Sequence, residues 1–119
     1  MRRKKTKKQR LLAEADRALQ IFVMKDRPRC LVCGRPAYCG HHFINKASSN
    51  ALRYYLPNMI PICIKHHLLV HSQPSLVDPV ISFKKGEAWF KDLMREKRKT
   101  VRTNNQFYSD AIEKYKEKM

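Results

Sequence analysis

Cysteine and histidine gather in one stretch of this chain, and that clustering restricts its possible folds more than any other feature. All four cysteines and all five histidines of the 119 residues lie between Cys30 and His71. A chain of this length forms one domain with a modest core, and its central segment alone is too small to be stable without a cross-link or a metal. No secretory signal is visible, so we expect metal ligation here rather than disulfides.

Four of these residues have the spacing of a structural zinc site. Cys30 and Cys33 form a CxxC pair, and Cys63 and His66 form a CxxH pair further along the chain. Three thiolates and one imidazole suit a tetrahedral Zn²⁺. Two alternatives stay open at this point. Cys39 can replace His66 as the fourth ligand, and the thiols can be buried side chains that bind no metal.

The remaining histidines fit a second site. On a helix, His67 and His71 are four residues apart and share one face, whereas His66 points about 100° away from His67. One short helix can therefore supply ligands to two different metals. On a strand, His41 and His42 point to opposite faces, so one of them can bind the second metal while the other addresses a substrate.

This set of side chains has the parts that phosphodiester hydrolysis needs. The reaction requires a general base for water, an ion that stabilises the leaving oxygen, and a group that holds the base in its reactive tautomer. No carboxylate occurs between residues 27 and 77. A second metal would therefore be held by imidazoles, which favours a transition metal over Mg²⁺.

Apolar periodicity predicts helices on both sides of this region. Leucine, alanine and phenylalanine recur at helical spacing from about residue 9 to residue 24, and Arg27-Pro28 should end that helix. Further helices are expected over residues 87–102 and from about Gln106, after a linker that runs from a break at Gln73-Pro74-Ser75 to about Lys85.

The expected fold class is α+β, with a small zinc-stapled ββα core. The sequence predicts strands over residues 37–44 and 58–62, a polar loop between them, and a helix over residues 63–71. The single domain then divides into a flexible basic tail at 1–10, an N-terminal helix at 11–25, the metal-binding core at 26–75 and basic C-terminal helices at 84–119.

The charge balance indicates a polyanionic partner. The net charge is +16, from 26 Lys and Arg against 10 Asp and Glu, and both flanks are strongly cationic. Nucleic acid is the commonest such partner, and no apolar run is long enough to span or anchor in a membrane. We expect DNA, although RNA fits the same chemistry, and a cytoplasmic location in a bacterial or phage-infected cell. The candidate contact residues are Arg2, Arg3, Lys4, Lys5, Lys7, Lys8 and Arg53.

The order of these motifs resembles a known nuclease superfamily. A CxxC, a His-His pair, an Asn, a CxxH-His and a further His look like the HNH, or ββα-metal, endonucleases. Within it, "HHFI" followed by "ALRYYLPNMIPIC" is similar to phage NinG-type recombination proteins, and the His-His, Asn, His-xxx-His frame is similar to colicin DNases. The likeness covers about residues 26–72, and the flanks share only their basic, helical character.

The resemblance implies a metal-dependent endonuclease that hydrolyses DNA, associated with a phage or another mobile element and with a role such as recombination. By resemblance His42 takes the general-base position, and Asn58 takes the middle position, where it tightens the loop and orients that base. His67 takes the final metal-ligand position, and His41 and His71 match additional ligands of the colicin branch.

The sequence departs from many members of the superfamily in two places. His41 stands where many have Asp, so the catalytic metal stays open among Zn²⁺, Ni²⁺, Mn²⁺ and Mg²⁺. Cys63 and His66 stand where many have a second CxxC, which leaves the structural ligand set open. The alternative to a nuclease is a noncatalytic, zinc-stabilised DNA-binding module. Such a module needs four ligands, and this chain offers nine cysteines and histidines.

Overall fold

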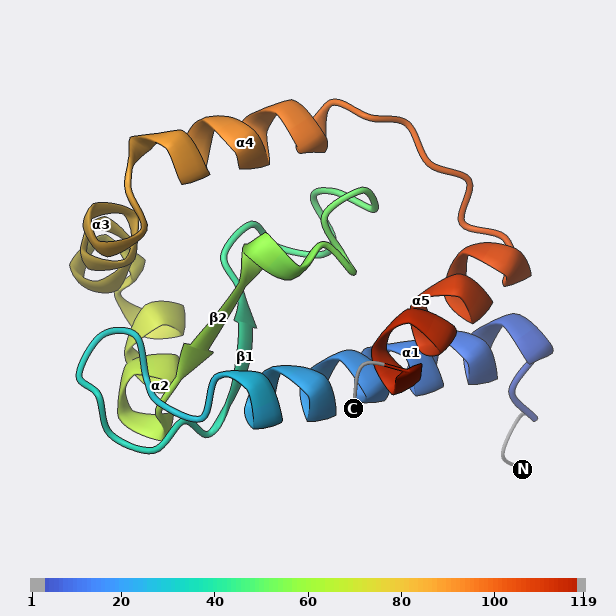
Figure 1. Cartoon of the computed structure of the whole chain (residues 1–119), viewed down its shortest axis with the longest axis horizontal. Helices are drawn as coiled ribbons and strands as arrows, with labels where there is room; N and C mark the ends of the chain where they lie inside the picture. The colour runs from blue at the N-terminus through green and yellow to red at the C-terminus, as the bar shows by residue number, and fades with distance from the viewer. Residues whose placement is uncertain (1–3, 118–119) are drawn as a thin grey trace.

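The computed structural model describes residues 4–117 and contains five α-helices and one two-stranded antiparallel sheet, which confirms the α+β class (Figure 1). The sheet lies in the middle, α1 and α5 lie side by side along one edge, and α2 and α3 lie at the end away from the N-terminus. The elements are α1 (Lys7–Asp26), β1 (Cys39–His42), η1 (Leu56–Asn58), β2 (Met59–Ile62), α2 (Ile64–Ser72), α3 (Pro74–Lys85), α4 (Glu87–Lys97) and α5 (Asn105–Glu117).

Helix α1 begins earlier than expected because Thr6 caps it. The Thr6 hydroxyl accepts a hydrogen bond from the Gln9 backbone N–H at 3.1 Å, and the Gln9 side chain accepts one from the Thr6 N–H at 2.8 Å. This reciprocal pair satisfies two N–H groups that a helix start otherwise leaves unpaired. The prediction of a flexible tail over residues 1–10 is therefore wrong for residues 7–10, which form the first helical turn.

The two predicted strands and the short helix after them are present in the expected order. Strands β1 and β2 pair antiparallel, with His41 opposite Ile60 and His42 opposite Met59. Cys63 caps the start of α2, which directly follows β2. Strand β1 covers only the middle of the predicted span of residues 37–44.

The predicted linker between Gln73 and Lys85 is instead helix α3. The break itself is observed, because Gln73 is the non-helical residue between α2 and α3. Pro74 occupies the first position of α3, where its missing N–H costs nothing. Val77 and Ile81 are four residues apart and are both fully buried, so tertiary packing outweighs the proline inside this helix.

Helix α4 ends at Lys97, earlier than the predicted 102. The residues that follow, 98–104, form a connection that carries the chain from α4 across to α5 (Figure 1). Thr100 and Val101 in this connection are β-branched, which favours extended backbone over helix. The predicted start of the last helix near residue 106 is confirmed, and the Asn104 side chain accepts from the Phe107 N–H at 2.9 Å.

The sheet separates two apolar clusters. Met59 packs in one cluster with residues of α1 and α5, whereas Ile60 and Ile62 pack in the other with residues of α2 and α3. Since side chains opposite each other in an antiparallel pair share a face, His41 points to the side of α2 and His42 to the side of α1. The two neighbouring histidines therefore reach different surroundings.

Strand β1 lies against α1 at a glycine. The Gln20 side chain bonds both the N–H and the carbonyl of Gly40, each at 2.8 Å. A Cβ at Gly40 would lie 3.0 Å from Cε of Met59 and 3.1 Å from Cγ1 of Val23, closer than ordinary contact. A side chain at this position would have to displace these neighbours by a few tenths of an ångström, so the close approach of the helix to the strand favours glycine.

We expect Gly40→Ala to lower the free energy of unfolding by about 1–3 kcal/mol, because the added methyl group overpacks the contact between α1 and β1. Urea denaturation followed by circular dichroism would measure this change, with metal content determined on the same samples. An unchanged unfolding midpoint would contradict the expectation and would show that the side chains of Met59 and Val23 accommodate the methyl group at no cost.

Candidate metal centres

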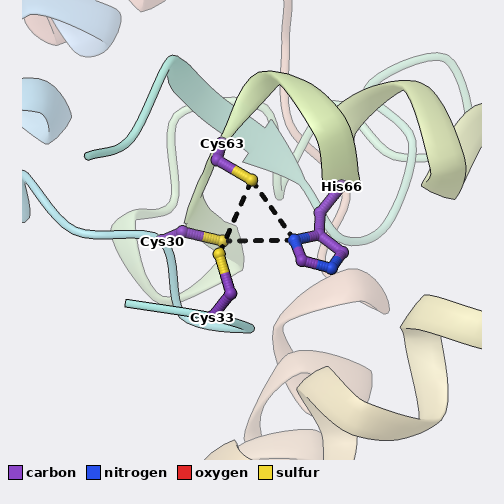
Figure 2. Close-up of side chains that lie close together, drawn as sticks. All are labelled: Cys30, Cys33, Cys63 and His66. Carbon is purple, nitrogen blue, oxygen red and sulfur yellow. Dashed lines mark hydrogen bonds between the residues drawn. The ribbon is translucent and has the colours of Figure 1, made fainter. Parts of the chain in front are cut away.

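The residues predicted for structural zinc lie together. Sγ of Cys33 is 3.7 Å from Sγ of Cys63, and Nδ1 of His66 is 3.2 Å from Sγ of Cys63 and 3.9 Å from Sγ of Cys30. One donor atom from each of the four residues lies within 4.8 Å of all the others. Figure 2 shows the four side chains pointing toward one another, with His66 reaching in from α2.

This donor set fits zinc in both chemistry and spacing. A tetrahedral site with Zn–S bonds of about 2.3 Å places neighbouring sulfurs about 3.8 Å apart. The observed sulfur–sulfur distance of 3.7 Å matches that edge, and none of the four cysteines forms a disulfide. A Cys₃His cluster of this kind can bind a structural metal such as Zn²⁺.

The backbone around Cys30 prepares its sulfur for a metal. Burial alone would raise the pKa of the Cys30 thiol, but hydrogen bonds from the backbone N–H groups of Cys63, Cys33 and Val32 outweigh burial and lower the pKa. A lowered pKa favours the thiolate, the form that binds metal. Gly34 supplies the tight turn after the CxxC pair, with a φ of 77° that other residues rarely adopt.

Cys39, the alternative fourth ligand, lies outside the cluster. It is the first residue of β1, opposite Ile62, and its side chain is half-buried beside the apolar cluster under α2. Burial raises the pKa of its thiol, which opposes metal binding. The structure therefore favours His66 over Cys39 as the fourth ligand.

We expect the purified chain to hold one tightly bound zinc at this cluster, and Cys63→Ser to remove it with most of the cooperative unfolding transition, because the metal replaces core packing that the central segment lacks. Elemental analysis and thermal melting would measure both effects. Cys39→Ser is the matched control and should keep the zinc. Wild-type protein without bound zinc, and equally stable in a chelator, would contradict the assignment.

A second group of three imidazoles lies beside α2. Nε2 of His67 is 3.1 Å from Nε2 of His71, and the His41 ring centroid is 5.9 Å from that of His67 and 5.7 Å from that of His71. One nitrogen of each ring lies within 4.8 Å of the other two. Burial, and then the neighbouring His67 and His71, lower the pKa of His41 to about 4. A neutral imidazole is the form that can bind a metal.

The separation of His66 from His67 is confirmed. His66 belongs to the cysteine cluster, and His67 belongs to the imidazole cluster with His41 and His71. Adjacent residues on a helix differ by about 100° around its axis, which sends the two rings to different sides of α2.

His42, the predicted general base, is held in one tautomer. Its Nε2 lies 3.0 Å from the carbonyl oxygen of Arg53. Because a carbonyl only accepts, Nε2 must carry the hydrogen, and Nδ1 of the neutral ring is left free to take a proton. Burial lowers the pKa of His42 and so favours this neutral form.

Asn58 forms hydrogen bonds across the loop between β1 and β2, which also contains Arg53. Its side chain is fully buried, and its Oδ1 accepts from the Ile44 N–H at 2.8 Å. Its Nδ2 donates to the Ile44 carbonyl at 3.0 Å and to the Leu52 carbonyl at 3.4 Å. The amide thus joins both ends of the loop between the strands, the loop whose Arg53 carbonyl lies against His42.

Arg53 has a structural partner that the sequence did not reveal. Its guanidinium forms two bonds with the Asp16 carboxylate, at 2.6 and 3.1 Å, and the Tyr54 hydroxyl donates to the same carboxylate at 2.8 Å. The prediction that Arg53 contacts nucleic acid is disfavoured, because its half-buried guanidinium already pairs with the Asp16 carboxylate. Its carbonyl, rather than its charge, faces the site.

A cleft of about 360 Å³ opens beside His42 and the imidazole cluster. The sequence did not identify the two charged residues of its lining, Lys46 and Asp78. Lys46 lies in a polar loop, where a single lysine gives no signal of a site. Asp78 was missed because α3 was taken for a linker, although the spacing of Val77 and Ile81 is a helical signal; burial raises the pKa of its carboxyl. The cleft therefore holds a cation and a carboxylate in addition to imidazoles.

The other predicted nucleic-acid contacts lie away from this cleft. Lys4 and Lys5 precede α1, and Lys7 and Lys8 lie exposed in its first turn, at the end of the molecule opposite α2 (Figure 1). Arg2 and Arg3 lie outside the described residues. Among residues 4–117, none of the helices has the length and apolar character to cross a bilayer.

Comparisons of the chain with known protein families, with curated proteins and with solved structures find no match. The case for a function therefore rests on the residues of this chain and on the geometry described above.

Proposed function

We propose that this protein is a metal-dependent endonuclease of the HNH kind that hydrolyses DNA phosphodiester bonds. The observation that carries the proposal is the environment of His42. Its Nδ1 is left unprotonated by the bond from Nε2 to the Arg53 carbonyl, and His42 is one of the residues that line the cleft beside His41, His67 and His71. A base next to a group of metal ligands is the arrangement that hydrolysis of a phosphodiester requires.

The reaction assigns a task to each side chain. Nδ1 of His42 takes a proton from the attacking water, whose oxygen forms the new bond to phosphorus. The bond from phosphorus to the leaving oxygen then breaks, and that oxygen takes a proton from solvent. His41, His67 and His71 would hold a divalent metal, whose positive charge would stabilise the leaving oxygen. Lys46 lines the cleft and is half-exposed, with only a long 3.9 Å pair to Asp16, so it can contact the phosphate.

The charge of the chain supports DNA as the substrate. The net charge is +16, and the longest dimension of the fold is 40 Å. That length corresponds to about 12 base pairs of duplex at 3.4 Å each. The molecule is therefore long enough to contact several separate phosphates of one duplex, with binding that is salt-sensitive and largely independent of sequence.

We expect the zinc-loaded protein with an added divalent metal to nick plasmid DNA, and His42→Ala to lose at least about 100-fold in rate, because removal of the general base leaves water without a proton acceptor. Gel assays with Mg²⁺, Mn²⁺, Ni²⁺ and Zn²⁺ would measure this, and gel-shift assays should show unchanged DNA binding. A wild type that shifts DNA but cuts with none of these metals would favour the noncatalytic DNA-binding module.

The Asp16–Arg53 ion pair should affect the turnover rate without taking part in the reaction. Asp16→Asn weakens the anchor of the loop whose carbonyl holds His42, so the turnover rate should fall on the order of tenfold to 100-fold through misplacement of the base. The apparent DNA affinity should not fall, since Asp16 lies outside the cleft and the loss of its charge releases Lys46, which pairs with it at 3.9 Å. Single-turnover cleavage at saturating enzyme separates the two quantities.

Glu14→Gln is the matched control for this experiment. Glu14 lies on the same helix and pairs with Lys116 at 2.7 Å, away from the loop. Equal effects of the two substitutions on turnover would show that Asp16 only stabilises the fold.

A further inference from the structure

A second hollow, of about 370 Å³, opens on the zinc side of α2. Its volume falls within the range of small-molecule sites, roughly 300–1,000 Å³. Its lining is apolar and basic, and no carboxylate contributes to it. The lining residues are Arg35, Pro36, Ala37, Tyr38, Cys63, Ile64 and Lys65.

Large apolar side chains in and beside this hollow are exposed to solvent. In the lining, Tyr38 is 60% exposed and Ile64 is 55% exposed. Leu68, which lies outside the lining one turn further along α2, is 65% exposed. The backbone under Tyr38 is fixed, because its N–H donates to the Ile62 carbonyl at 2.8 Å. An aromatic ring that faces solvent from a hydrogen-bonded stretch of backbone is typical of a binding surface.

Tyr38 also connects this surface to the imidazole cluster. Its ring centroid lies 6.2 Å from that of His67, with the planes tilted by 40°. A planar group that stacks on Tyr38 would therefore lie next to the candidate catalytic metal ligands.

The basic part of the hollow is free to bind anions. Arg35 and Lys65 are both exposed, and neither forms an ion pair within the described part of the chain. An exposed aromatic ring and two unpaired cations in the lining of one hollow match the chemistry of a nucleotide, with a π-face for the ring and a phosphate for each cation.

We propose that this hollow binds an unpaired nucleotide of a DNA strand, with its base stacked on Tyr38 and its phosphates contacted by Arg35 and Lys65. The choice of DNA as the ligand rests on the proposed function. The existence of a binding site rests on the hollow, the exposed Tyr38 ring and the two unpaired cations. A regular duplex keeps its bases stacked inside and cannot use Tyr38. The protein should therefore bind single-stranded DNA through a contact that duplex DNA does not make.

Fluorescence anisotropy with a labelled oligonucleotide, single-stranded or annealed to its complement, tests the proposal on the zinc-loaded full chain. Tyr38→Ala should weaken single-strand binding by about fivefold or more, the loss typical of one base–aromatic stack, and leave duplex binding unchanged. Tyr38→Phe should bind as the wild type does, because stacking needs the ring and not the hydroxyl. Arg35→Ala should also weaken single-strand binding and reduce its salt dependence.

Phe83→Ala is the matched control, since Phe83 is 87% exposed on α3 and lies outside the hollow. It should change neither affinity. The proposal is overturned if the wild type does not bind the single strand, or if Tyr38→Ala weakens both forms equally. It is also overturned if Tyr38→Ala leaves both affinities unchanged and alters sedimentation instead, the result expected of a contact between two copies of the chain.

The binding assay needs no cleavage, so it separates this proposal from the nuclease proposal. Single-strand binding that depends on Tyr38 in a protein without nuclease activity would keep the nucleotide site and remove the catalytic assignment. If Tyr38→Ala changed neither the cleavage rate nor the single-strand affinity, the catalytic assignment would be kept and the nucleotide site would be removed.

Discussion

The arrangement of the centre of this molecule depends on the convergence of Cys30, Cys33, Cys63 and His66. The first two belong to a turn before the sheet, and the last two lie at the start of α2, directly after β2. A metal bound at this point would join the turn to the helix and would thereby fix how α2 lies relative to the strands. Its ligand bonds would add to the packing of the apolar cluster beside it.

The same short helix then orients the second cluster. Once His66 is fixed by the cysteines, the helical rotation leaves His67 and His71 facing β1, where His41 meets them. The strand alternation sends His42 the other way, toward α1. The helical rotation thus separates a candidate structural ligand, His66, from the candidate catalytic ligands that follow it. The alternation of the strand separates His41 from His42, the candidate base.

These parts of the structure were predictable from sequence because they depend on local spacing. The CxxC and CxxH pairs, the helical i, i+4 relation of His67 and His71, and the two strands are all set within short segments. The partner of Arg53 was not predictable, because Asp16 lies on a different element and the ion pair forms only in the folded chain. Helix α3 was missed for a related reason, since its two buried residues outweigh its prolines only after they pack against α2.

The flanking helices do more than carry charge. The loop between the strands is fastened from α1 by Asp16, from α4 by Trp89, whose Nε1 donates to the Pro57 carbonyl at 2.7 Å, and from α5 by the Tyr115 hydroxyl, which donates to the Tyr54 carbonyl. This is the loop whose Arg53 carbonyl sets the tautomer of His42.

The two metal-ligand clusters are therefore complete within residues 30–71, whereas the surroundings of the candidate base require helices from both ends of the chain. Metal binding and base positioning are built from different parts of the sequence. Substitutions in the flanks can disturb the base while both ligand clusters stay intact.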